Sequence, residues 1–183
     1  MFFQIQKTTP QILQTAQNYF PRSYWQNLSK ESLLARFLIA QKVIEQFKIK
    51  NFYPQFKSNG AVKFDLQKKI YFSLSHKNDF VAIAVSRQEI GIDLEILKNR
   101  HKSLWNNFKT KEWEILKQKD WLNFYFLWTA KEALIKKLQL NLNALKQIFL
   151  QNKNKNILNL QFEKKIFPVK IFQKENLIYA IAE

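Results

Sequence analysis

The sequence predicts an α+β protein of two halves, because helical and extended patterns follow one another twice along its 183 residues. Apolar residues recur at helical spacing over 29–47. Two further helices are expected at 110–119 and 121–138, each after a polar residue that is able to cap it, and the second of them is dense in aromatics. Short β-like runs with turn-forming connectors follow the helices in two groups, at 70–74, 80–85 and 90–94 and again at 157–162, 167–172 and 177–181. We expect two halves, 1–90 and 91–183, each a small, mainly antiparallel sheet packed with helix.

Polar residues indicate where the three helices begin. Ser29 is placed to cap the first, and Asp120 to cap the aromatic-rich third. Thr110 is the expected cap of the second helix. Glu112 and Glu114 then fall in its first turn, where the helix dipole favours carboxylates.

The composition excludes several classes of protein. Zero cysteines exclude disulfides, thiolate nucleophiles and iron–sulfur clusters. No run approaches the roughly 18 apolar residues of a membrane span, and the first residues lack a signal-peptide pattern. We therefore expect a cytoplasmic protein with no membrane partner.

The net charge of +16 would attract polyanions, such as nucleic acid, acidic proteins and phosphorylated small molecules. A strongly AT-biased genome would also produce this Lys-rich composition without any selection for binding. The charge therefore indicates which partners are tolerated and does not identify one.

A pair of carboxylates stands in the hexapeptide Ile90-Gly91-Ile92-Asp93-Leu94-Glu95. Side chains alternate faces along a strand, so Asp93 and Glu95 share one face. Mg²⁺ commonly takes one or two such carboxylates and completes its shell with water and phosphate oxygens. The alternative is a strand end whose acidic residues face water or nearby lysines.

A second motif, Trp128-Thr129-Ala130-Lys131-Glu132-Ala133-Leu134-Ile135-Lys136, lies on the third predicted helix. Glu132 and Lys136 are i,i+4 neighbours, with Trp128 one turn before Glu132. A metal ligand or proton acceptor and a phosphate-binding cation would thus line one edge. The alternative is a solvated Glu/Lys pair beside a core tryptophan.

A third feature is Ser75-His76, which we place in the turn after the strand 70–74. A Ser hydroxyl and a protonatable ring are able to contact phosphate there, although a surface histidine without a task fits equally well. His101 lies between Arg100 and Lys102 and is expected to be solvated.

Taken in order, these pieces resemble the 4′-phosphopantetheinyl transferases of the Sfp type. The resemblance covers roughly Ser29 to Lys146 and includes a helix with Arg36. Residues 128–136 fit that family's W-x-x-K-E-x-x-x-K signature, and 39 positions separate Asp93 from Glu132, a gap like that of the family.

The resemblance implies a Mg²⁺-dependent enzyme that moves the phosphopantetheine arm of coenzyme A to a serine of an acyl or peptidyl carrier protein, releasing adenosine 3′,5′-bisphosphate. It implies three sets of site residues: Asp93, Glu95 and Glu132 for the metal, Arg36, Ser75, His76, Lys131 and Lys136 for coenzyme A, and Glu132 and Lys136 for catalysis. Glu112 is the alternative base.

The resemblance also implies two similar halves related by a pseudo-two-fold, with the active site in the cleft between them. The first half would contact the nucleotide and the second would carry the metal-binding carboxylates. We expect a monomer that acts on an acidic carrier, with fatty acid biosynthesis as one candidate pathway. That carrier is expected to dock near Lys136–Lys146.

One departure from the family concerns the loop after Gly60. The family tends to carry a Lys-Pro pair there, whereas Ala61-Val62-Lys63 follows here. Two alternatives to the transferase are a basic nucleic-acid-binding module and a Mg²⁺-dependent phosphohydrolase.

Overall fold

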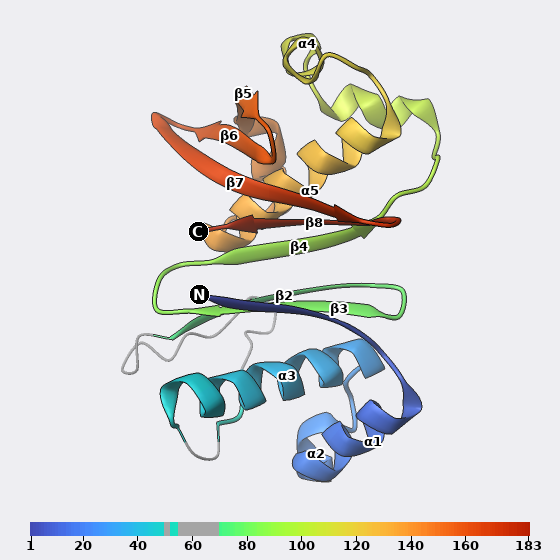
Figure 1. Cartoon of the computed structure of the whole chain (residues 1–183), viewed down its shortest axis with the longest axis vertical. Coiled ribbons are helices and arrows are strands. Elements are labelled where there is room, and N and C mark those ends of the chain that lie inside the picture. Colours follow the sequence, from blue (N-terminus) through green and yellow to red (C-terminus); the bar gives the residue numbers. More distant parts are fainter. Residues whose placement is uncertain (50–51, 55–69) are drawn as a thin grey trace. The chain divides into compact units, whose positions relative to one another are not determined.

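The structure is a computed structural model that describes residues 1–49, 52–54 and 70–183 (Figure 1). These residues form two compact units, Met1–Ile90 and Gly91–Glu183. Each unit has an antiparallel sheet packed with helices, which confirms the mixed α+β class. The predicted similarity of the two halves stays a prediction.

The first unit contains a three-stranded sheet in the order β1-β3-β2. Its elements are β1 (Phe2–Lys7), α1 (Pro10–Tyr19), α2 (Arg22–Trp25), α3 (Lys30–Phe47), β2 (Tyr71–Lys77) and β3 (Phe80–Ser86). Helix α3 packs on β3 and β2, and α1 packs on α3. The apolar side of α3 thus forms the centre of this unit's core.

Helix α3 begins where its sequence predicts. The Ser29 hydroxyl accepts the N–H of Ser32 at 3.1 Å, which satisfies one of the donors left open at a helix start. The helix ends at Phe47 because Lys48 turns left-handed, with φ of 56°. The predicted cap is confirmed.

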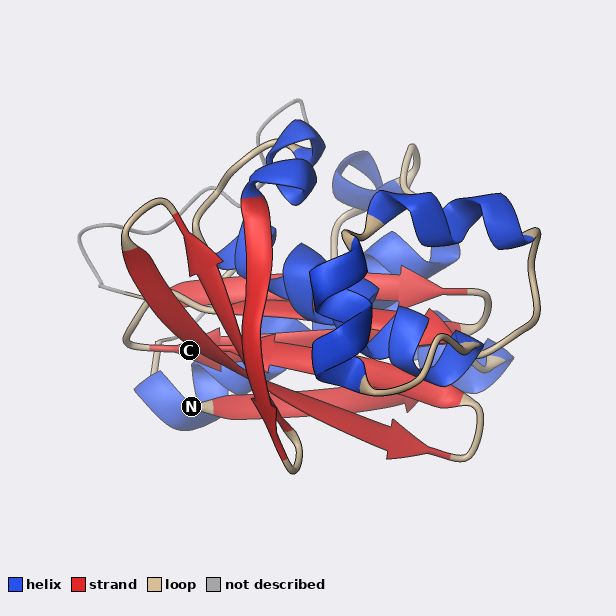
Figure 2. Cartoon of the chain, turned by 90° about the horizontal axis from the view of Figure 1, so that it is seen from above, coloured by secondary structure: helices blue, strands red, loops and turns tan. Residues whose placement is uncertain are grey.

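The second unit contains a five-stranded sheet in the order β4-β8-β7-β6-β5. Its elements are β4 (Gly91–Ile96), the 3₁₀ helix η1 (Lys102–Asn107), α4 (Thr110–Leu116), α5 (Trp121–Lys137), the 3₁₀ helix η2 (Leu142–Gln147), β5 (Ile148–Asn154), β6 (Ile157–Phe162), β7 (Lys165–Lys174) and β8 (Leu177–Ala182). Figure 2 shows the helices and strands in separate colours. Helix α5 packs on β4, β8 and β7 and buries the apolar face of the sheet.

Helix α5 is capped by Asp120, as predicted, through a 2.8 Å hydrogen bond from the N–H of Asn123. Helix α4 differs from its prediction. Thr110 is its first helical residue, Lys109 occupies the cap position, and the helix ends at Leu116 because Lys117 is left-handed. None of the helices among the described residues has the length and apolar content needed to cross a membrane.

Candidate active site

The carboxylates predicted on the acidic hexapeptide lie on β4, an outer strand of the five-stranded sheet. Asp93 is buried and Glu95 is half-buried. The strand alternates as predicted, so Gly91, Asp93 and Glu95 share one face while Ile92 and Leu94 occupy the other.

Gly91 determines how closely α5 approaches this strand. A Cβ atom at Gly91 would lie 1.9 Å from the carbonyl oxygen of Ala133 and 2.6 Å from the backbone nitrogen of Lys137. Both atoms belong to the helix backbone, which no side-chain rotation moves. The face that carries Asp93 and Glu95 is therefore the face on which α5 packs, and only glycine permits this distance.

The close approach brings two predicted site residues together. Lys136 Nζ lies 2.7 Å from Oδ1 of Asp93 and also donates to the carbonyl of Ile92 at 3.1 Å. The Asp93 side chain is 3% exposed, whereas that of Lys136 is 32% exposed. The ion pair thus joins a buried carboxylate to a partly accessible ammonium across 43 positions of sequence.

Glu132 lies one helical turn before Lys136 on the same face of α5 and is half-buried. Within the described ranges, no three His, Cys, Asp or Glu side chains form a group that could hold a metal ion. The donor chemistry nevertheless suits Mg²⁺. Asp93 and Glu95 offer two carboxylates on one face, and this ion commonly takes its remaining ligands from water and phosphates.

Lys131, the other lysine of the signature, points into the second unit's interior. Its side chain is 1% exposed, and Nζ pairs with Oε1 of Glu112 at 2.8 Å. Burial lowers the pKa of Lys131, while the charge and hydrogen bond of Glu112 act in the opposite direction. A direct contact with coenzyme A requires an ammonium that is accessible to solvent. That of Lys131 is not accessible in this structure.

Glu112, the alternative base, is equally buried. Besides Lys131, its carboxylate accepts the N–H of Lys109 at 3.0 Å and the N–H of Leu150 at 2.9 Å. A carboxylate that satisfies three donors inside the core is poorly placed to receive a proton from a substrate. This geometry argues against a proton-accepting role for Glu112.

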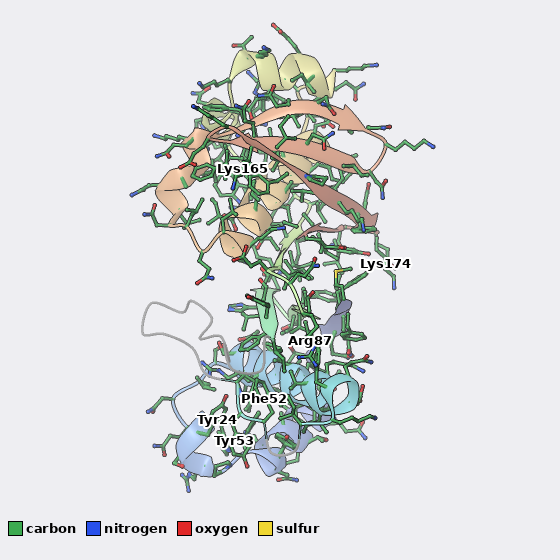
Figure 3. All side chains as sticks on the ribbon, turned by 90° about the vertical axis from the view of Figure 1, so that its left-hand side faces the viewer. Tyr24, Phe52, Tyr53, Arg87, Lys165 and Lys174 are labelled. Atoms are coloured by element: carbon green, nitrogen blue, oxygen red, sulfur yellow. The ribbon has the colours of Figure 1, made fainter. Side chains whose placement is uncertain are left out.

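Arg36 lies on α3 in the first unit, half-buried beside a group of aromatic rings. Its Nη1 donates to the hydroxyl of Tyr24 and to the carbonyl of Pro54, both at 3.3 Å. Tyr24 in turn donates to Pro54, and its ring lies 5.9 Å from that of Tyr53 (Figure 3). Burial raises the pKa of Tyr24, although Arg36 opposes this, so the phenol keeps its proton and remains a donor.

Ser75 and His76 lie within β2, which continues to Lys77, so the prediction that they sit in a turn is wrong. The actual turn is at Asn78, with φ of 48°, between the paired strands β2 and β3. As strand neighbours, the two side chains project to opposite faces: Ser75 is buried and His76 is exposed. The 60–63 loop, with Gly60 and Lys63, lies outside the described residues.

Three features of the site escaped sequence reasoning. Gly91 belongs to the acidic hexapeptide, but nothing in the sequence showed that α5 packs against it. The Lys131–Glu112 pair and the Tyr24–Arg36 contact join residues that are distant in sequence. Neither has a local pattern that would reveal it.

Two comparisons with known proteins show what this chain is similar to. Residues 89–182, more than half of the chain, match the model of the 4′-phosphopantetheinyl transferase superfamily. The chain is also 28% identical over 155 residues to 4′-phosphopantetheinyl transferase gsp of Aneurinibacillus migulanus, an alignment that covers 79% of this chain and 63% of that protein. The chain thus spans less than two thirds of the length of this relative. It belongs to the 4′-phosphopantetheinyl transferase superfamily.

Proposed function

We propose that this protein transfers the 4′-phosphopantetheine arm of coenzyme A to a serine of a carrier protein in the presence of Mg²⁺. The observation that carries the proposal is the 2.7 Å pair between Lys136 and Asp93. The pair joins α5, the helix that carries the W-x-x-K-E-x-x-x-K signature, to β4, the strand that carries Asp93 and Glu95. Both elements lie inside the segment that matches the family. The predicted cation and the predicted metal ligand are therefore neighbours.

Asp93 and Glu95 would hold the metal. Glu132 of α5, which does not form a three-carboxylate group with them among the described residues, is proposed as the third ligand once the ion is bound. When bound, Mg²⁺ would supply charge neutralisation at the diphosphate of coenzyme A. Lys136 orients Asp93 through one N–H and contacts the Ile92 carbonyl through a second. An ammonium has three donors, so the third is available to a phosphate oxygen.

The proposed transfer is a single displacement. The carrier serine gives its proton to the carboxylate of Glu132, and its oxygen forms a bond to the phosphorus next to the pantetheine arm. The bond from that phosphorus to the bridging oxygen breaks, and adenosine 3′,5′-bisphosphate leaves with the electron pair. Lys136 stabilises the charge that develops on the diphosphate.

The first unit would contribute contacts to the nucleotide. Arg36 carries five N–H donors. Its Nη1 already donates to the hydroxyl of Tyr24 and to the carbonyl of Pro54, and these hydrogen bonds fix the orientation of the guanidinium. Ser75 and His76 project to opposite faces of β2, so the two side chains would contact different groups. Lys131 is left out of this set because its ammonium is buried with Glu112.

The proposed protein partner is an acidic acyl or peptidyl carrier. The net charge of +16 would accelerate encounter with such a partner. Lys136–Lys146, which begins in the last turn of α5 and continues beyond it, is the proposed docking stretch. A monomer is the proposed state.

The experiment incubates the purified protein with coenzyme A, Mg²⁺ and several apo carrier proteins and records intact masses. The expected result is addition of one phosphopantetheine to a carrier. Omission of Mg²⁺ and the exposed-site variant Asp79→Asn serve as negative and positive controls. No mass change with any carrier would contradict the proposal, and product release from coenzyme A without carrier would point instead to a phosphohydrolase.

A further inference from the structure

The buried ion pair between Glu112 and Lys131 is a feature that the proposed chemistry does not use. Both side chains are at most 4% exposed, and their charged atoms lie 2.8 Å apart. The ring of Phe108 covers Lys131, with Nζ 4.8 Å from the ring centroid. The pair therefore lies inside the aromatic core between α4 and α5.

The carboxylate of Glu112 binds groups from three elements, α4, α5 and β5. One oxygen accepts the N–H of Lys109 at the start of α4, and the other accepts both Lys131 Nζ from α5 and the N–H of Leu150 from β5. Leu150 is also where the pairing of β5 with β6 shifts register. A single carboxylate thus fixes α4, the middle of α5 and the irregular part of an outer strand.

Stability alone does not account for this arrangement. Moving two charges out of water is costly, and apolar side chains of similar volume often fill such a space equally well. Apolar packing, however, has no preferred direction, whereas these hydrogen bonds have defined donor and acceptor positions. What the pair adds is a defined rotation of α5 about its axis and a defined position along that axis relative to α4 and β5.

The residue that follows Lys131 in α5 is Glu132, and Lys136 lies one turn further. Rotation or sliding of α5 would move both away from the acidic face of β4. We propose that Glu112 and Lys131 are positioning residues, which set the orientation of α5 so that Glu132 and Lys136 face Asp93 and Glu95. The inference rests on the proposed function for the roles of these four residues.

The test compares Lys131→Met, Glu112→Gln and the double variant that carries both changes. Each single variant leaves one buried charge without its counter-charge and should be destabilised. The double variant removes both charges and should recover much of the thermal stability. The control is Lys170→Met, which breaks the exposed Lys170–Glu183 pair and should match the parent protein in every measurement.

Hydrogen–deuterium exchange over 91–96 and 132–137 is the first measurement, since it reports on the contact between α5 and β4 without substrate. The double variant should exchange faster in both segments while peptides of the first unit stay unchanged. Unchanged exchange in a stable double variant would overturn the inference. This outcome is independent of whether the protein transfers phosphopantetheine.

Transfer kinetics and Mn²⁺ binding to the free protein provide the second measurement. In the double variant, kcat should fall about 10-fold to 100-fold, because small misplacements of reacting groups have effects of this size. Mn²⁺ affinity should fall as well, with KM for coenzyme A nearly unchanged. Full recovery of kcat and Mn²⁺ affinity together with thermal stability would show a merely structural pair.

Lys131→Arg provides a further arm if the double variant does not fold. It keeps a charged donor toward Glu112 but places that donor farther from the helix axis. The expected result is a folded protein with a lower kcat and faster exchange over 132–137. Parent-like values of both would contradict the proposed positioning role. Failure of the parent protein to modify any carrier would instead contradict the proposed function, while the exchange data would still test the positioning role.

Discussion

At the residue scale, Gly91 links the packing of the second unit to its proposed chemistry. A methyl group at Gly91 would meet backbone atoms of α5 at 1.9 and 2.6 Å. The helix would have to move away, and Lys136 would no longer reach Asp93 in the same geometry. The smallest side chain is thus a requirement for the ion pair next to it.

Gly91→Ala should therefore lower the free energy of unfolding by about 1–3 kcal/mol, the range for overpacked interiors, and sometimes by more. Urea unfolding followed by circular dichroism measures the change. Lys98→Ala, at an exposed site just after β4, is the control and should stay within about 0.5 kcal/mol of the parent protein. A Gly91→Ala variant as stable as this control would contradict the close approach of α5.

The charge of Asp93 is the next residue-scale prediction. Asp93→Asn keeps an oxygen that accepts a hydrogen bond from Lys136 but removes the negative charge that a metal requires. The fold should survive, and transfer should fall by about 100-fold or more, as when other electrostatic groups of active sites are removed. Transfer rates measured over a Mg²⁺ series test this. A parent-like rate at low Mg²⁺ would remove Asp93 from the proposed metal site.

At the scale of elements, the tyrosine contact in the first unit ties α2 and residues 52–54 to α3. The hydroxyl of Tyr24 bonds to Pro54 and accepts a hydrogen bond from Arg36. Tyr24→Phe removes this hydroxyl and leaves the stacking on Phe20, at 4.5 Å, in place. Arg36 would then lose one of the contacts that orient it.

We expect Tyr24→Phe to raise KM for coenzyme A several-fold with little change in kcat, because the loss is one of orientation for a proposed nucleotide contact. Steady-state kinetics at saturating carrier separates the two constants. Tyr53→Phe, on the neighbouring exposed ring, is the matched control. Equal KM values for the two variants would show that Tyr24 does not position Arg36.

Local patterns predicted some elements and missed others for identifiable reasons. Helix α3 was predictable because an amphipathic pattern and the Ser29 cap coincide, and α5 because an aromatic-rich run follows the Asp120 cap. Strand β1 was missed, and its partner, β3, is distant in sequence; β5 was missed because its apolar residues end at Leu150 and a polar half follows. The helix α1, which begins at Pro10 after Thr9, was missed although its cap and proline are recognisable start signals.

The candidate site shows the same division. The family resemblance assigned Lys136 and Asp93 to one site, and the two side chains are neighbours in the structure. The inward direction of Lys131 depends on Glu112, which belongs to another helix, and on Leu150 in a strand. A signature lysine looks the same in the sequence whether it faces a substrate or a core. Only the tertiary packing distinguishes the two.

At the scale of the whole molecule, the charge is the dominant property, with 30 Lys and Arg against 14 Asp and Glu. Among the described residues, some lysines lie over aromatic rings, as Lys119 does over Trp105 and Lys109 over Phe149. Such contacts keep the positive charge uncompensated while burying part of the aliphatic stem. The second unit therefore retains a positive field at its surface.

This field gives a prediction that separates selected charge from genomic bias. If it steers an acidic carrier, kcat/KM for that carrier should fall about tenfold between roughly 0.05 and 0.5 M KCl, because salt screens charges beyond a few ångströms. With coenzyme A and Mg²⁺ held saturating, kcat should change little. A carrier variant with its acidic surface residues made neutral should lose this salt dependence. Equal salt dependence for the two carriers would show that the charge has no part in recognising the partner.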